Sequence, residues 1–243
     1  MYSSNFQSVS VAQKNFGYKP GSTSSNPIFT NELLGALDFT DQHLDTLIDA
    51  LKKADTYHET LLIVTAKHGQ SPIDPSLSKK IAPSSIQAAS SVQFAQVTAD
   101  DGAYVWLVDA TLANINKAKE DLLAAATTLG IARVLAGNEI YQNGFGDPKF
   151  DPRVPDLIII TKPGIIYAKP TAIKIAEHGG INDDDLTVAL LIHNPKLEKK
   201  SIMERVYTRQ VAVTAVKALG GDIEQLDGAM YDGTSVLPGL TLE

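Results

Sequence analysis

Residues 60–74 read Thr-Leu-Leu-Ile-Val-Thr-Ala-Lys-His-Gly-Gln-Ser-Pro-Ile-Asp, and this stretch decides the fold. The apolar, β-branched run at 61–65 predicts a buried parallel strand, and the polar segment after it predicts a loop at the strand's carboxyl end. Open α/β sheets bind their ligands at that end. His68 followed by Gly69 suits such a loop, because glycine permits a sharp turn while the imidazole can bind a metal or move a proton.

Length and composition set the limits of the fold. With 243 residues, 44% of them hydrophobic, the chain can bury one α/β core together with a small subdomain. No apolar stretch is long enough for a spanning helix, so we expect no transmembrane segment. Residues 1–5 lack the basic flank and apolar centre of a secretion signal, so an extracellular location would require a signal that has been removed or left out.

The charge and the residue types narrow the possible ligands. The formal net charge of -7 argues against a nucleic-acid polymer as partner, because surfaces that follow phosphate backbones are basic. A small anion would need a local positive site. The sequence contains no cysteine, which excludes disulfides, thiolate metal sites and thiol nucleophiles. Any metal must therefore bind to histidines and carboxylates.

The remaining elements predict an α/β domain with an insertion. Apolar spacing predicts an amphipathic helix at 31–54 with Asn31 as its N-cap, and alternation at 6–11 is consistent with an edge strand. The predicted division is an N-terminal segment, helix and first core strand at 1–80, a small α+β insert at 81–150, and the rest of the α/β domain at 151–243. The elements expected after residue 80 are strands at 92–97, 104–108 and 131–135, a helix at 111–129, main-sheet strands at 156–161 and 187–192, a helix at 208–219 and a loop-like end at 233–242.

A second His-Gly pair accompanies a later strand of the predicted main sheet. His178 and Gly179 lie before three aspartates, 183–185, and the strand at 187–192. Imidazoles on strand-end loops are common zinc ligands, but zinc takes three or four protein ligands, so carboxylates would have to supply the others. We expect His43 and His58 to be exposed and His193 to be satisfied locally, which leaves His68 and His178 as the candidate pair.

Other polar groups give weaker indications of a metal or catalytic site. The aspartates 38, 41 and 45 fit the solvated face of the helix, and Asp147 and Asp151, each followed by proline, fit turns better than a calcium site. Thr65 and Ser71 flank His68, but the sequence contains neither a Gly-x-Ser-x-Gly elbow nor a glycine-rich phosphate loop. No nucleophile is therefore identified from the residues alone.

The segments around the two histidines resemble a known family. The stretch 60–70 is similar to the Asp-His-Gly strand end of the alkaline phosphatase superfamily, in its type I phosphodiesterase/nucleotide pyrophosphatase branch. Lys174-Ile-Ala-Glu-His178-Gly-Gly with the strand to Pro195 resembles that branch's later His loop. The stretches 151–156, 164–167, 208–212 and 233–239 also resemble the branch, in the same order along the chain.

This resemblance implies the C-terminal part of an alkaline-phosphatase-like three-layer αβα sandwich with a small α+β insert. In the branch, two divalent ions, usually zinc, act with a Thr or Ser nucleophile that attacks phosphorus. The nucleophile, one metal Asp and an Asp–His pair come from the family's N-terminal half, which this sequence lacks. The resemblance implies zinc or another divalent metal as cofactor. His68 and His178 match metal ligands that serve different ions in the family, so neither ion would keep a complete set of ligands in this chain.

Lys67 stands where the family has a metal-binding Asp. A protonated ammonium cannot ligate zinc, so Lys67 either marks a site that has lost its metal or supplies a positive charge for a phosphate or sulfate oxygen, as single-metal sulfatase relatives suggest. Two functions follow as hypotheses. One is a metal-dependent phosphodiester or pyrophosphate hydrolase acting on a small phosphate ester, inactive as this chain alone. A partner that supplies the missing half would favour this hydrolase. The alternative is a non-catalytic descendant that binds a ligand or protein, and a self-standing chain of this kind is expected to form a homo-oligomer.

Overall fold

The structure is a computed structural model that describes residues 1–240 and divides into two compact units. Unit 1 comprises residues 1–41 and 68–187, and unit 2 comprises residues 42–67 and, of the described residues, 188–240. Of the expected loop-like end at 233–242, the last two residues lie outside the described part. No helix of the described residues is long and apolar enough to cross a membrane.

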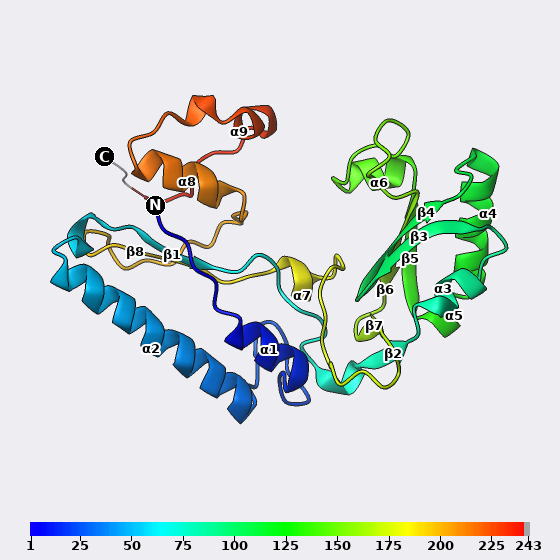
Figure 1. Ribbon diagram of the computed structural model, residues 1–243, viewed down its shortest axis with the longest axis horizontal. Coiled ribbons are helices and arrows are strands. Elements are labelled where there is room, and N and C mark those ends of the chain that lie inside the picture. Colours follow the sequence, from blue (N-terminus) through cyan, green and yellow to red (C-terminus); the bar gives the residue numbers. More distant parts are fainter. Residues whose placement is uncertain (241–243) are drawn as a thin grey trace. The chain divides into compact units, whose positions relative to one another are not determined.

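A four-stranded antiparallel sheet forms the centre of unit 1 (Figure 1). Its strands lie in the order β3-β4-β6-β5, with Val105 opposite Leu157 in one pair and Val134 opposite Ile159 in the next. The strands are β3 (Phe94–Ala99), β4 (Gly102–Leu107), β5 (Ile131–Ala136) and β6 (Leu157–Thr161). All residues of β6 are buried, as expected for a strand with a neighbour on each side and a layer on each face.

Alternation along the strands divides the core into two layers. Leu157 and Ile159 of β6 pack into the larger cluster with Ile86, Leu122 and Leu129 of the helices. Ile158 and Ile160 face the opposite way, into a smaller cluster that includes Ile140. Figure 1 shows the corresponding helices on opposite faces of the sheet, α3 (Ser84–Ala88), α4 (Leu112–Ala124) and α5 (Ala126–Leu129) on one and α6 (Asn138–Gln142) on the other.

The strand predicted at 156–161 pairs differently from our expectation. We placed it in the main sheet, but β6 lies between β4 and β5, in the sheet of the predicted insert. The apolar run of this strand fits the main sheet and the insert sheet equally well, because a strand buried on both faces has the same sequence pattern in either sheet. The helix predicted at 111–129 is divided into α4 and α5 at Ala125. Its predicted ends are confirmed: Thr111 caps α4 by accepting from the Asn114 N–H, and Gly130 ends α5 with a positive φ of 63°.

The first residues of unit 1 also differ from the prediction. Residues 6–11 do not form an edge strand, because α1 (Ser8–Asn15) includes most of them. The long helix is confirmed as α2 (Asn31–Lys53), but its cap is Thr30, whose Oγ1 accepts from the Leu33 N–H at 3.3 Å. The other short elements of this unit are the 3-10 turn Pro75–Leu77, the parallel strands β2 (Lys79–Ile81) and β7 (Ile165–Tyr167), and α7 (Asp183–Leu186).

Unit 2 contains the strand from which the sequence analysis began. We expected a buried parallel strand, but β1 (Leu62–Thr65) pairs antiparallel with β8 (Leu190–His193), and its residues are only partly buried. In the described part of the chain these two strands form a two-stranded sheet, so no neighbouring strand covers the apolar run. The unit also contains the 3-10 turns Tyr57–Glu59 and Ile223–Gln225 and the helices α8 (Gln210–Ala218) and α9 (Asp227–Asp232).

Candidate functional site

Two loops of unit 1, at 68–71 and 177–185, are joined by main-chain hydrogen bonds. Ser71 and Glu177 form an antiparallel bridge in which each N–H donates to the other residue's carbonyl, at 2.7 and 2.9 Å. The Gly69 N–H donates to the carbonyl of Asp185 at 2.7 Å. These three bonds hold the segments around His68 and His178 against each other.

Gly69 is required for this approach. A Cβ added at Gly69 would lie 1.9 Å from the carbonyl oxygen of Asp184, which is far inside van der Waals contact. The absent side chain therefore allows the two backbones to meet, as we expected of a glycine after His68.

The two loops bring His68 and His178 together. Their rings stack with centroids 3.7 Å apart and planes inclined by 25°. His68 Nδ1 lies 2.7 Å from the carbonyl oxygen of Gly69. Because a carbonyl only accepts, Nδ1 must be the donor, and a neutral His68 ring then carries its lone pair on Nε2.

The surroundings of His178 favour its neutral form. Burial lowers the pKa of this imidazole, and the positive charges of His68 and Lys14 lower it further, against the opposing effect of Glu177 and Asp101. A neutral ring is the form that binds metals. The His178 ring is thus favoured in the form that can bind a metal.

Glu177, directly before His178, carries a charge that is compensated inside the protein. The residue is 3% exposed, and its carboxylate contacts Lys14 Nζ at 2.8 Å and also Lys174. Burial alone would raise the pKa of Glu177, but the hydrogen bonds and charges of the two lysines outweigh it, so the net shift is downward. Glu177 is therefore held as an anion, and Lys14 attaches α1 to the histidine loop.

The described residues do not by themselves fit a complete metal site. They contain no group of three or more histidine, cysteine or acidic side chains placed to hold one ion. His68 and His178 would supply two of the three or four protein ligands that zinc takes. Lys67, where a metal carboxylate was expected by resemblance, is exposed to solvent.

The other predicted residues have local roles. His193 is satisfied by the Tyr57 hydroxyl, at 2.7 Å from Nε2, as expected. Asp147 accepts from the Lys149 N–H, which makes a turn, and Asp151 forms an ion pair with Arg153. The residues that flank His68 are not poised as nucleophiles, because the Thr65 hydroxyl donates to the Ala189 carbonyl and Ser71 is buried in the loop bridge.

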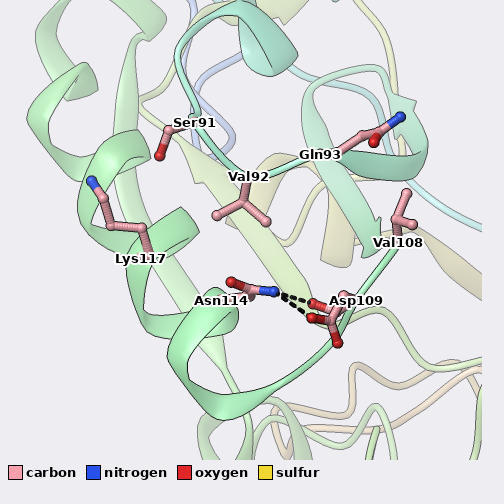
Figure 2. Close-up of a pocket in the computed structure, with 7 residues that line it drawn as sticks. All are labelled: Ser91, Val92, Gln93, Val108, Asp109, Asn114 and Lys117. Carbon is pink, nitrogen blue, oxygen red and sulfur yellow. Dashed lines mark hydrogen bonds between the residues drawn. The ribbon is translucent and has the colours of Figure 1, made fainter.

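A separate hollow of about 380 Å³ lies in the predicted insert and contains none of the candidate residues (Figure 2). Figure 2 shows the Asn114 amide directed at Asp109, to which it donates at 2.9 and 3.0 Å. Lys117 points away toward Asp121, its ion-pair partner. The polar groups of Asp109, Asn114 and Lys117 are thus used within the protein. Its lining residues are Ser91, Val92, Gln93, Val108, Asp109, Asn114 and Lys117.

Sequence reasoning missed the carboxylates around the histidine loop. Glu177 is adjacent to His178, and Asp185 ends the acidic run at 183–185, but neither the burial nor the partners of these side chains is visible in the spacing. Asp101 comes from the turn between β3 and β4, far from both histidines in the sequence. Only the tertiary structure assembles them.

Comparisons with known proteins support the resemblance. A family model described as type I phosphodiesterase / nucleotide pyrophosphatase matches residues 1–182. No curated protein matches the sequence. Among solved structures, human ectonucleotide pyrophosphatase / phosphodiesterase 5 is similar, with a TM-score of 0.56 and 16% identity, over 95% of this chain and 53% of that one.

Two structures of the murine ectonucleotide pyrophosphatase / phosphodiesterase 5 are also similar. One has a TM-score of 0.55 and 17% identity and covers 98% of this chain and 62% of that chain. The other, an inactive variant in complex with AMP, has the same TM-score and identity and covers 87% of this chain and 50% of that chain. The chain thus spans between about half and two thirds of these structures. The predicted α/β class with an alkaline-phosphatase-like fold is confirmed.

Proposed function

This chain belongs to the type I phosphodiesterase / nucleotide pyrophosphatase family, and from that premise we propose that it is part of a metal-dependent phosphoric ester hydrolase. In this proposal His68 and His178 are metal ligands, Lys67 is a positive charge that faces the anionic substrate, and the nucleophile and remaining ligands come from outside the described residues. The substrate class is a small phosphodiester or pyrophosphate.

The observation that carries the proposal is the stacking of the two imidazoles, 3.7 Å apart, on loops that three backbone bonds tie together. Two histidines so placed, one of them with a lowered pKa, offer neutral nitrogen ligands of the kind that zinc prefers. A similar murine structure is described in complex with AMP, which supports a nucleotide phosphate as the ligand class.

Zinc titration of the purified chain by calorimetry tests the metal ligands. Three proteins are compared: the wild type, the His68→Ala/His178→Ala variant, and the His58→Ala/His193→Ala variant, which loses the same number of imidazoles elsewhere. We expect the first variant to bind zinc at least about tenfold more weakly than the wild type, and the second to bind within about twofold of it. A wild type that binds no zinc would show that this chain alone does not hold the ion, and two variants that bind zinc alike would overturn the proposed ligands.

The proposed role of Lys67 in anion binding is tested on the zinc-loaded chain. AMP is titrated into the wild type and the Lys67→Met variant, and we expect weaker binding without the ammonium, by about threefold to tenfold. Hydrolysis of bis(p-nitrophenyl) phosphate is then measured with and without zinc. If zinc binds at the two histidines but neither AMP nor the diester is recognised, the alternative function, a non-catalytic binding module, replaces the hydrolase.

A further inference from the structure

Two carboxylates next to the histidine loop are buried without an ion-pair partner among the described residues. Asp101, in the turn between β3 and β4, is 1% exposed, and Asp185, in α7, is 3% exposed. All four of their carboxylate oxygens are inaccessible and have no hydrogen-bond partner among the described residues. Neither side chain forms an ion pair with a lysine, arginine or histidine of that part of the chain.

Two ionised carboxylates cannot stay buried side by side without a positive charge between them. An ionised carboxylate only accepts hydrogen bonds, so two facing carboxylates have nothing to offer each other. Charges buried in proteins are paired or coordinate metals, because an isolated buried charge costs several kcal/mol. Something positive must therefore lie between Asp101 and Asp185, either a proton or a cation.

The main chain beside the pair brings a further oxygen close to the two carboxylates. A Cβ at Gly180 would lie 3.0 Å from Asp185 Oδ2, 3.1 Å from Asp101 Cγ and 3.1 Å from the Asp101 carbonyl oxygen. Both carboxylates and a main-chain carbonyl thus converge on the side of Gly180 where other residues carry a side chain. Gly102 packs against the same place, with its own Cβ position 3.3 Å from Gly180 Cα.

We propose that Asp101 and Asp185 bind a hard divalent cation of the calcium class, with the carbonyl oxygen of Asp101 as a further ligand. This site is distinct from the histidine pair and does not depend on the proposed function. Calcium takes six to eight oxygen ligands from carboxylates, carbonyls and water, which is the donor type that converges beside Gly180. The bound ion would fasten the 177–186 loop to the β3–β4 turn.

A cation accounts for the site better than a shared proton. One proton between the carboxyl groups gives a partner to two oxygens, whereas a cation can contact oxygens of both groups and the carbonyl together. Burial, followed by the neighbouring Asp101, raises the pKa of Asp185 to about 9. The amide of Gly179 is close enough to oppose that shift but does not reach hydrogen-bond geometry with either oxygen. An ion that enters the site must therefore displace this proton.

Thermal unfolding of the whole chain, with EDTA or with increasing calcium, tests the site. At a calcium concentration about a hundredfold above Kd, we expect the wild-type Tm to rise by about 5–10 °C. Asp101→Asn and Asp185→Asn should each abolish the rise. A calorimetric calcium titration should give one site per chain. Gly180→Ala should weaken calcium binding, because its methyl group would crowd the oxygens that bind the ion.

Matched controls separate this site from other acidic and metal-binding groups. Asp183→Asn removes the same charge from the exposed start of α7 and should keep the full calcium response. His68→Ala/His178→Ala should also keep it, so a failure of the histidine proposal leaves this test intact. If calcium, magnesium and manganese leave the wild-type Tm unchanged, or raise it equally in Asp185→Asn, the pair is satisfied by a proton and the cation site is wrong.

Discussion

Glu177 and Asp185 stand on either side of His178 in one loop, and both are 3% exposed, yet their surroundings are opposite. Glu177 meets two lysines, whereas Asp185 faces another carboxylate, that of Asp101. The pKa of Glu177 is lowered, and the pKa of Asp185 is raised to about 9. Burial raises both values, so the sign of the net shift is decided by the charge of the neighbours.

The comparison separates two ways of stabilising a loop. Through Glu177, the chain's own cations fix the first part of the loop to α1, and nothing external is needed. Through Asp185, the last part of the loop contacts the β3–β4 turn, where two ionised carboxylates would repel each other until a proton or a cation enters. The Gly69–Asp185 backbone bond holds this end of the loop in either case, so only its side-chain contact depends on an external positive charge.

The largest effect should come from removing the compensated charge. Glu177→Gln keeps the size of the side chain but leaves Lys14 and Lys174 without their anion, so we expect unfolding to become easier by about 3 kcal/mol. Chemical denaturation at pH 7 measures this change. Because Glu177 has a lowered pKa, the wild type should lose this contribution as the pH falls below about 4.5, the ordinary value of a glutamate, and through the lowered pKa.

The control for this prediction is the pH profile of the variant. Glu177→Gln cannot titrate at this position, so its stability deficit should shrink as the wild-type carboxylate becomes protonated. A deficit that stays constant from pH 7 to pH 3 would show that Glu177 acts through packing rather than charge, and the contrast with Asp185 would then be lost.

The uncompensated charge should respond in the opposite direction. In EDTA at pH 8, Asp185→Asn should stabilise the chain, on the order of 1 kcal/mol, because the unfolded wild type ionises this carboxyl freely whereas the folded wild type has to keep it protonated beside Asp101. A raised pKa means that the folded state holds the proton more tightly than the unfolded state. The wild type should therefore lose stability as the pH rises from about 4 toward 9, and the variant should have a flatter profile.

Denaturation profiles of the wild type and Asp185→Asn from pH 5 to pH 9 measure this effect, with Asp183→Asn as the exposed control. Equal slopes in all three proteins would contradict the coupling of Asp185 to Asp101. With calcium present the order should reverse, because only the wild type can bind the ion. The two conditions thus distinguish an empty site from a filled one.

The sequence predicted the elements better than their pairing. Helical spacing located α2, and strand patterns located β3 to β6, because these signals depend on residues a few positions apart. The parallel orientation expected of β1 and the sheet expected of β6 were wrong, since an apolar strand does not encode which strand lies beside it or in which direction. The helix at 8–15 was missed because its alternating start resembles an edge strand.

The candidate site shows the same limit. The two His-Gly pairs indicated loops that meet, and the structure places His68 and His178 in contact. The charges that surround them come from α1, the β3–β4 turn and α7, so their assembly depends on long-range packing. The aspartates at 183–185 illustrate this, because Asp183 is exposed and Asp185 is buried only two residues later.

The smallest effects should distinguish the two lysines of Glu177. The Lys14 side chain is 20% exposed and that of Lys174 is 47% exposed, so water screens Lys174 more strongly. We expect Lys14→Met to cost about 1–2 kcal/mol and Lys174→Met less than about 1 kcal/mol. Each substitution should raise the pKa of Glu177, which a pH titration of its side-chain carboxyl followed by NMR would measure, and the rise should be larger without Lys14. If the two variants were equal, burial would not set the strength of these pairs.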